Sequence, residues 1–162
     1  MIQISANELA SIMGGTLYGS AEMSVSTEFQ FDSRAIKKGD VFLALKGESV
    51  DGHDFVDDAF NRGAVLAIAT KQVNVPYIIV DDVLKAIGKF AAYVRDNLTG
   101  LIVIGITGSQ GKTTTKDMVN SILANEGKTV AAKGSFNNDL GVPLTLLRCT
   151  DETKFCVVEM GA

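Results

Sequence analysis

The first half of the chain alternates between segments with helical and with strand-like spacing of apolar residues. Residues 5–15 (SANELASIMGG) predict a helix, because Ser5 can cap it, Glu8 follows three residues later, and two glycines close it. Residues 53–64 predict a second helix. The remaining apolar runs have the length of strands and lie at 40–47, 64–69 and 77–80. We therefore expect a small mixed α/β domain over residues 1–82.

The second half begins with a long amphipathic segment. Residues 81–98 place their apolar side chains on one helical stripe, and we expect a connecting helix over 83–99. Residues 101–107 (LIVIGIT) form a continuous apolar run, which is typical of a parallel strand covered on both faces. The later predicted elements are a helix at 112–126, a strand at 128–133, a short helix within 134–148 and a strand at 154–160. This alternation predicts an α/β fold with a parallel sheet in residues 100–162.

The composition agrees with a core-forming domain and excludes some functions. The 162 residues are 46% hydrophobic and 21% charged, which is not the composition of a disordered chain. The net charge is −4 and the pI is about 4.9, so no basic nucleic-acid surface is indicated. No signal peptide and no membrane-length apolar run are present. Cys149 and Cys156 have no metal-site spacing, and we expect reduced, buried thiols in a cytoplasmic protein.

A glycine-rich segment between the apolar run and the next helix carries the clearest chemistry. The strict phosphate-loop pattern G-x-x-x-x-G-K-[ST] is met by Gly111, Lys112 and Thr113, but its first glycine is replaced by Ile106. Gly108 still permits a close backbone approach to phosphate. Lys112 can reach the β- and γ-phosphates, and the Thr113 hydroxyl can ligate Mg²⁺. The alternative is a simple glycine turn with an exposed lysine.

Four other polar residues have a structural interpretation, and for three of them a functional one is also open. Glu159 ends an apolar strand, where it can bind Mg²⁺ at the ligand edge of a parallel sheet or be an exposed edge carboxylate. Asn137 and Asn138 can face a substrate, although their composition favours a turn. His53, the single histidine, is interpreted as a surface residue near a helix cap.

Four stretches together resemble one family of enzymes. They are FDSRAIKKGDVFLALKGESVDGHDF (31–55), ITGSQGKTTTKDMV (106–119), GSFNNDLGVPLTLLR (134–148) and VVEMGA (157–162). They resemble the Mur ligases, the ATP-dependent amino-acid ligases of peptidoglycan synthesis, and the resemblance extends over the whole chain. The loop of that family is G-x-x-G-K-[ST]-[ST], so Ile106 is normal for it.

The resemblance implies roles for individual residues. The first family domain binds the UDP part of a nucleotide precursor and the second binds ATP with Mg²⁺. Lys112 would contact the γ-phosphate and would be the catalytic group, while Thr113 and Glu159 would bind Mg²⁺. The implied ATP-binding residues are Thr107, Gly108, Ser109, Gln110, Gly111, Lys112, Thr113 and Thr114. The implied substrate-binding residues are Asp32, Ser33, Arg34, Lys46, Asn137 and Asn138. Ser135 departs from the asparagine that is common in the most similar subgroup.

The implied reaction joins D-alanyl-D-alanine to UDP-N-acetylmuramoyl-tripeptide through an acyl phosphate. Phosphoryl transfer of this kind depends on positioning and on charge neutralisation. Two alternatives stay open: the preceding family member, which adds the third amino acid, and a UDP-nucleotide-binding module without catalysis. The segment NNDLGVPLTLLR (137–148) favours the D-alanyl-D-alanine-adding subgroup.

The chain resembles all of the first family domain but only the start of the second. A three-stranded parallel sheet would be small and would leave open edges. We therefore expect the chain to be an inactive fragment of a longer ligase and to self-associate through an exposed sheet edge. The alternative is that the short sheet is complete.

Overall fold

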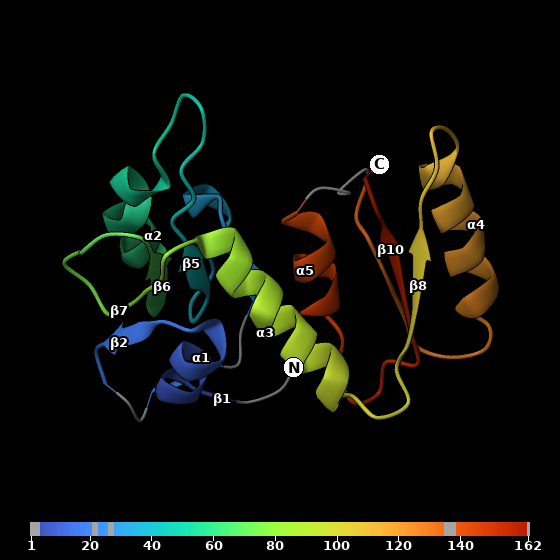
Figure 1. Ribbon diagram of the computed structural model, residues 1–162, viewed down its shortest axis with the longest axis horizontal. Coiled ribbons are helices and arrows are strands. Elements are labelled where there is room, and N and C mark those ends of the chain that lie inside the picture. The colour runs from blue at the N-terminus through green and yellow to red at the C-terminus, as the bar shows by residue number, and fades with distance from the viewer. Residues whose placement is uncertain (1–3, 21–22, 26–27, 135–138, 162) are drawn as a thin grey trace. The chain divides into compact units, whose positions relative to one another are not determined.

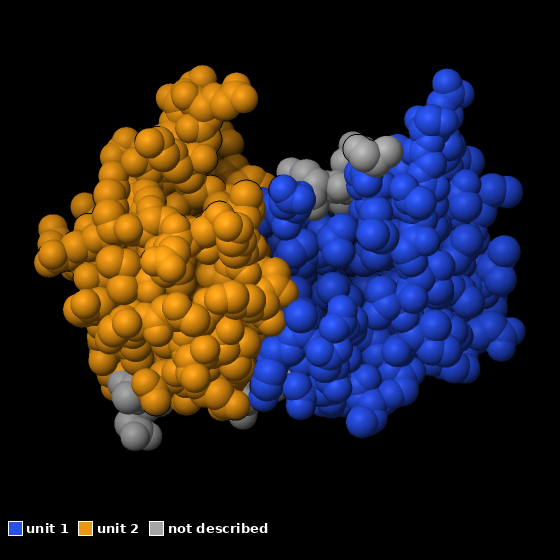
Figure 2. Space-filling model, in the orientation of Figure 1, with its two compact units in different colours: residues 1, 91–162 blue, residues 2–90 orange. Residues whose placement is uncertain are grey.

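A computed structural model describes residues 4–20, 23–25, 28–134 and 139–161. The chain divides into two compact units, residues 2–90 and residues 91–162 together with residue 1 (Figure 2). Among the described residues, no helix has the length and apolar character needed to cross a membrane. The fold is α/β, as expected from the sequence.

The unit of residues 2–90 is built on a five-stranded mixed sheet with the order β2-β7-β6-β5-β4. Its strands are β2 (Thr16–Tyr18), β4 (Phe29–Gln30), β5 (Val41–Leu43), β6 (Leu66–Ala69) and β7 (Tyr77–Ile79). The four strands from β4 to β7 are parallel, and β2 pairs antiparallel with β7. The carboxyl ends of these four parallel strands therefore lie along one side of the sheet.

Helices and a short ribbon complete this unit. The ribbon pairs β1 (Ile4–Ser5) with β3 (Ser24–Val25). The helices are α1 (Ala6–Met13), α2 (Val56–Arg62) and the short 3₁₀ helices η1 (Ser33–Ala35) and η2 (Gly52–Phe55). The cap predicted for α1 is confirmed, because the Ser5 hydroxyl accepts a hydrogen bond from the Glu8 N–H at 3.2 Å. The strands β5 and β6 are wholly buried, which makes the sheet centre the core of the unit.

The long helix α3 (Val83–Asn97) contains the point at which the two units divide. Its N-terminal half belongs to the first unit, where Phe90 packs at 5.6 Å between ring centroids against Phe29. The expected boundaries at residues 82 and 100 stay a prediction.

The unit of residues 91–162 contains a three-stranded parallel sheet with the order β8-β10-β9. The strands are β8 (Ile102–Ile106), β9 (Thr129–Ala131) and β10 (Phe155–Glu159). The helices α4 (Lys112–Leu123) and α5 (Gly141–Leu146) lie on opposite faces of this sheet (Figure 1). The central strand β10 is buried along its full length, and Cys156 on it is a buried free thiol, as is Cys149.

The expectation that residues 101–107 form a strand buried on both faces is wrong. β8 pairs only with β10, and Ile102 and Val103 are 51% and 37% exposed. The buried apolar strand of this sheet is instead β10. An apolar run indicates that a strand can be buried, but burial also requires neighbours, and β8 has no second partner strand among the described residues.

Candidate functional site

The loop from Thr107 to Gly111 connects the carboxyl end of β8 to the N-terminus of α4. Gly108 and Gly111 have φ angles of 147° and 75°, which L-residues with side chains rarely adopt. A Cβ atom at Gly111 would meet no heavy atom within 4 Å, so the loop has open space there. The first N–H groups of α4 have no acceptor within the helix, and no side chain caps it. These features together are typical of helix starts that bind anions.

Lys112 lies at the first position of α4 and reaches back over the loop. Its Nζ donates to the Gly108 carbonyl oxygen at 2.6 Å, and the residue is only partly exposed. The interpretation of this segment as a plain turn with an exposed lysine is therefore wrong for the lysine. The ammonium lies against the loop at Gly108.

Thr113 and Glu159 meet although they are 46 residues apart in the chain. The Thr113 hydroxyl donates to Glu159 Oε2 at 2.9 Å. Glu159 ends the central strand and is 2% exposed, so the alternative of an exposed edge carboxylate is wrong. Threonine hydroxyl and carboxylate oxygens are hard ligands of the kind that Mg²⁺ binds in phosphate sites.

The donor set fits Mg²⁺ with few protein ligands. Among the described residues, no group of three or more His, Cys, Asp or Glu side chains could hold a metal by itself. Mg²⁺ in nucleotide sites keeps several waters and takes phosphate oxygens besides one or two carboxylate or hydroxyl ligands. Thr113 and Glu159 therefore fit the number and kind of protein ligands that such a site uses.

Lys116 is a polar residue of this region that the sequence did not single out. It lies one helical turn beyond Lys112 and is 3% exposed. Its Nζ donates to the carbonyl oxygens of Ala132 and Gly134 at 2.9 and 3.0 Å. No sequence signal distinguishes it from a solvated lysine on a helix.

In the first unit, the candidate substrate residues follow two neighbouring parallel strands. Asp32, Ser33 and Arg34 follow β4, and Lys46 follows β5, so the strand order brings them to one sheet edge. The Asp32 carboxylate accepts from Arg34 Nε and Nη2 at 2.9 and 2.8 Å. This guanidinium lowers the pKa of Asp32 to about 2. Lys46 is exposed.

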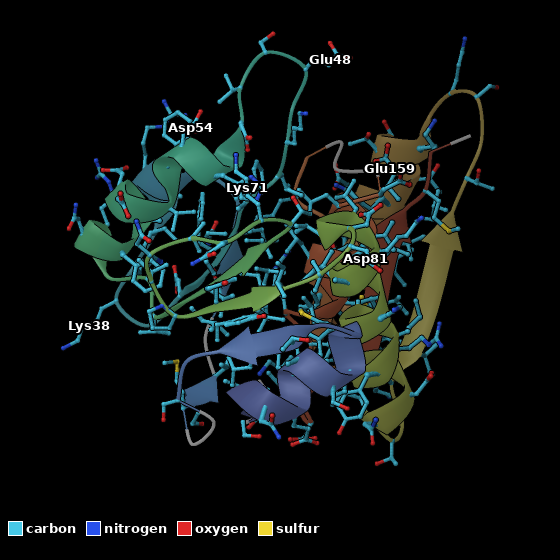
Figure 3. The ribbon with its side chains drawn as sticks, turned by 60° about the vertical axis from the view of Figure 1, so that its left-hand side comes forward. Lys38, Glu48, Asp54, Lys71, Asp81 and Glu159 are labelled. Carbon is cyan, nitrogen blue, oxygen red and sulfur yellow. The ribbon has the colours of Figure 1, made fainter. Side chains whose placement is uncertain are left out.

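The same edge includes polar residues that the sequence did not indicate. Lys71 and Asp81 come after β6 and β7, the next two strands of the sheet (Figure 3). Lys71 Nζ binds Asp51 Oδ2 at 2.9 Å. Both positive and negative side chains therefore lie along the carboxyl ends of these strands. Lys71 and Asp81 could be placed there only from the strand order.

His53 is buried, and its interpretation as a surface residue is wrong. Its Nδ1 binds Asp51 Oδ1 at 2.5 Å, and its Nε2 accepts from the Thr70 N–H at 3.1 Å. Hydrogen bonds from the His53 N–H, Lys71 and the His53 ring hold the pKa of Asp51 below its usual range. Both ring nitrogens make hydrogen bonds within the fold, so His53 connects η2 to the end of β6.

Asn137, Asn138 and Ser135 lie outside the described residues. Their expected substrate contacts stay predictions.

A glycine loop between a parallel strand and a helix, with a lysine and a threonine at the helix start, is typical of phosphate-loop α/β proteins. A family model described as "Mur ligase family, catalytic domain" matches residues 27–98, and one described as "Mur ligase middle domain" matches residues 106–162. The chain belongs to the Mur ligase family.

Individual relatives give the same result along the whole chain. A UDP-N-acetylmuramoyl-tripeptide–D-alanyl-D-alanine ligase of Escherichia coli (strain K12) is 40% identical over 164 residues, covering 100% of this chain and 36% of that protein. The crystal structure of MurF from Acinetobacter baumannii superposes with a TM-score of 0.91 at 37% identity, over 100% of this chain and 36% of that one. MurF ligase from Thermotoga maritima in complex with ADP has a TM-score of 0.75 at 36% identity, over 85% of this chain and 33% of that one.

This chain therefore spans little more than a third of the length of these relatives. It has the fold of the N-terminal part and of the start of the middle part of such a ligase.

Proposed function

We propose that this chain is the N-terminal part of an ATP-dependent ligase that joins D-alanyl-D-alanine to UDP-N-acetylmuramoyl-tripeptide. The observation that carries the proposal is the identity of 40% over the full chain with a ligase of that name, with the loop, Lys112 and Glu159 in one site. The nucleotide substrates would place the reaction in the cytoplasm.

The second unit supplies the phosphate side of the reaction. Bound Mg·ATP would supply the γ-phosphoryl group to the tripeptide carboxylate, which would give an acyl phosphate and ADP. The amine of the dipeptide would then attack the acyl carbon, form the peptide bond and displace inorganic phosphate. The loop N–H groups from Thr107 to Thr114 hold phosphate oxygens, and Lys112 neutralises charge on the transferred group. Thr113 and Glu159 would hold the metal, which would neutralise charge on the phosphates. Positioning and electrostatics would carry the rate enhancement, and the reaction needs no side chain as a nucleophile.

The first unit supplies the nucleotide-precursor side. Lys46 extends from the carboxyl end of β5, where its exposed ammonium can bind a diphosphate. Asp32, Ser33 and Arg34 occupy the end of the neighbouring strand and would contact the uridine end. Asn137 and Asn138 are proposed as further contacts to the substrate or the metal.

The 162 residues alone are proposed to bind a UDP precursor without catalysing ligation. The relatives are almost three times as long, and the remaining length would carry the other nucleotide and dipeptide contacts. The preceding ligase, which adds the third amino acid, is the second candidate. It is less well supported, because the relatives reported above are named for D-alanyl-D-alanine addition or as MurF.

The test is a ligation assay on the full-length protein that contains this chain. UDP-N-acetylmuramoyl-tripeptide, D-alanyl-D-alanine and Mg·ATP should give phosphate and a product heavier by one dipeptide, measured by mass spectrometry. Phosphate release with UDP-N-acetylmuramoyl-dipeptide and a single amino acid would instead identify the preceding ligase. No dipeptide-dependent release would overturn the proposal.

A further inference from the structure

The face of α4 that lies against the sheet carries two polar side chains with different partners. Thr113 and Lys116 are three residues apart, which places them on one side of the helix. Thr113 is bonded to Glu159 at the end of β10, whereas Lys116 is bonded to the segment that follows β9. The start of α4 is thus joined to the carboxyl ends of two neighbouring strands.

The ammonium of Lys116 has three polar contacts. It donates hydrogen bonds to the Ala132 and Gly134 carbonyl oxygens and forms an ion pair with Asp117 Oδ1 at 3.1 Å. The ammonium is 3% exposed, so it has left water and depends on these acceptors. Two of these contacts are to backbone carbonyl oxygens. Lys116 therefore holds the backbone of residues 132–134 rather than another side chain.

The strand register shows what this attachment positions. β9 and β10 run parallel, with Ala131 opposite Val157, and the Ala132 N–H donates to the Val157 carbonyl oxygen at 3.0 Å. Glu159 is two residues beyond Val157 on the central strand. The segment held by Lys116 therefore leaves the sheet beside the strand end that carries Glu159.

We propose that Lys116 is a positioning residue that couples the phosphate loop to the exit of β9. The proposal rests on the proposed function, because it concerns the alignment of the phosphate loop with Glu159 at the end of β10, beside which the β9 exit lies. The phosphate group itself is held by the helix start, so loss of Lys116 leaves ATP binding in place. It lets the β9 exit shift relative to the loop, and a shift of about 1 Å can lower a rate by about 100-fold.

The test compares variants of the full-length protein. Lys116→Met fills the same space but removes the donors, and Lys116→Arg keeps donors and charge. Lys128→Met is the matched control, because Lys128 is an exposed lysine of the same unit that pairs with Glu152. For Lys116→Met we expect kcat to fall by about 10- to 100-fold with the KM for ATP within about threefold of wild type. Lys116→Arg should recover most of the rate, and Lys128→Met should match wild type.

Hydrogen exchange gives a readout that does not need ligation. In the wild-type protein, Mg·ADP should slow amide exchange at residues 129–134 as well as in the loop. In Lys116→Met, the slowing should be confined to the loop. If Lys116→Met does not fold, the same comparison is made with Lys116→Arg and Lys116→Gln.

The outcomes separate the two proposals. A wild-type protein that forms no product contradicts the proposed function, while exchange still tests the coupling. A folded Lys116→Met variant with wild-type kcat, or with Mg·ADP protection that still reaches residues 129–134, overturns the positioning role. A lower melting temperature with unchanged kcat would show that Lys116 only stabilises the fold.

Discussion

The two units of this chain differ in how deeply their apolar strands are buried. In residues 2–90, β5 and β6 lie between other parallel strands and are completely buried. In residues 91–162, β8 is equally apolar but lies at a sheet edge with a residue 51% exposed. The comparison shows that apolar composition sets what a strand can bury, whereas the number of neighbouring elements sets what it does bury. In the first sheet β2 and β4 are the edge strands and the buried strands lie between them, whereas in the second sheet the apolar strand β8 is itself at the edge.

The largest expected effect on activity comes from substitution in the candidate phosphate loop of the second unit. Lys112→Met in the full-length protein should lower kcat/KM by about 100- to 1000-fold, because the charge that faces the transferred phosphoryl group is lost. Steady-state phosphate release measures it, with Lys128→Met as the control. A variant that retains ligation would mean that the loop is not the phosphate site.

The difference in strand burial should appear directly in stability. Ile68→Ala on β6 removes a fully buried side chain and should lower the free energy of unfolding of the first unit by about 2–5 kcal/mol. Ile102→Ala on β8 is the same substitution at an exposed position and should cost about 0.5 kcal/mol or less. Urea titration with hydrogen-exchange mass spectrometry resolves the two units. Equal costs would show that β8 is buried as deeply as β6.

The exposed edge should also make the 162-residue chain self-associate. Ile102 and Val103 are exposed on β8, and Met118 and Ile122 are 64% and 66% exposed on α4. Unpaired strand edges with apolar side chains recruit other chains, and a charge on the edge blocks this. Sedimentation velocity should show concentration-dependent association for the chain and much less for Val103→Lys. A monomer at all concentrations would mean that the edge is covered in another way.

The smallest effect concerns the ion pair at the end of β4. Since the folded-state pKa of Asp32 is lowered from 3.8 to about 2, its contribution to stability is present above pH 3.8 and is lost as the pH falls toward 2. Arg34→Ala should return the Asp32 pKa toward 3.8, measured by NMR titration of the carboxyl carbon. The pair is exposed, so added salt should reduce the shift. An unchanged Asp32 pKa in Arg34→Ala would show that the guanidinium does not cause the lowering.

The features that could be predicted from the sequence are those with a local signal. The Ser5 cap, the buried runs that became β5, β6 and β7, and the loop before α4 all depend on neighbouring residues. The strands β2, β3 and β4 are two or three residues long, which is too short for a period to be recognised. Burial of His53 and Lys116 depends on partners 16 to 18 residues away, and the sequence contains no mark of them.

Part of the candidate site could be predicted from the sequence and part could not. Lys112, Thr113 and Glu159 could be proposed because a motif and a strand end mark them, and the structure joins the last two by one hydrogen bond. Lys71 and Asp81 could be placed at the carboxyl ends of the parallel strands, beside Asp32 and Lys46, only once the strand order was known. An exposed edge of the small sheet was expected, but the sequence did not show that β8 would form it, since the pattern of a strand does not specify which strands will lie beside it.

The most direct measurement is a calorimetric titration of the 162-residue chain with UDP-N-acetylmuramoyl-tripeptide and then, separately, with Mg·ATP. The account predicts saturable binding of the UDP compound to the first unit and much weaker binding of Mg·ATP to the second unit. Lys46→Met should weaken the first and leave the second unchanged. Absence of binding by the UDP compound would contradict the claim that the first unit is a complete precursor-binding module.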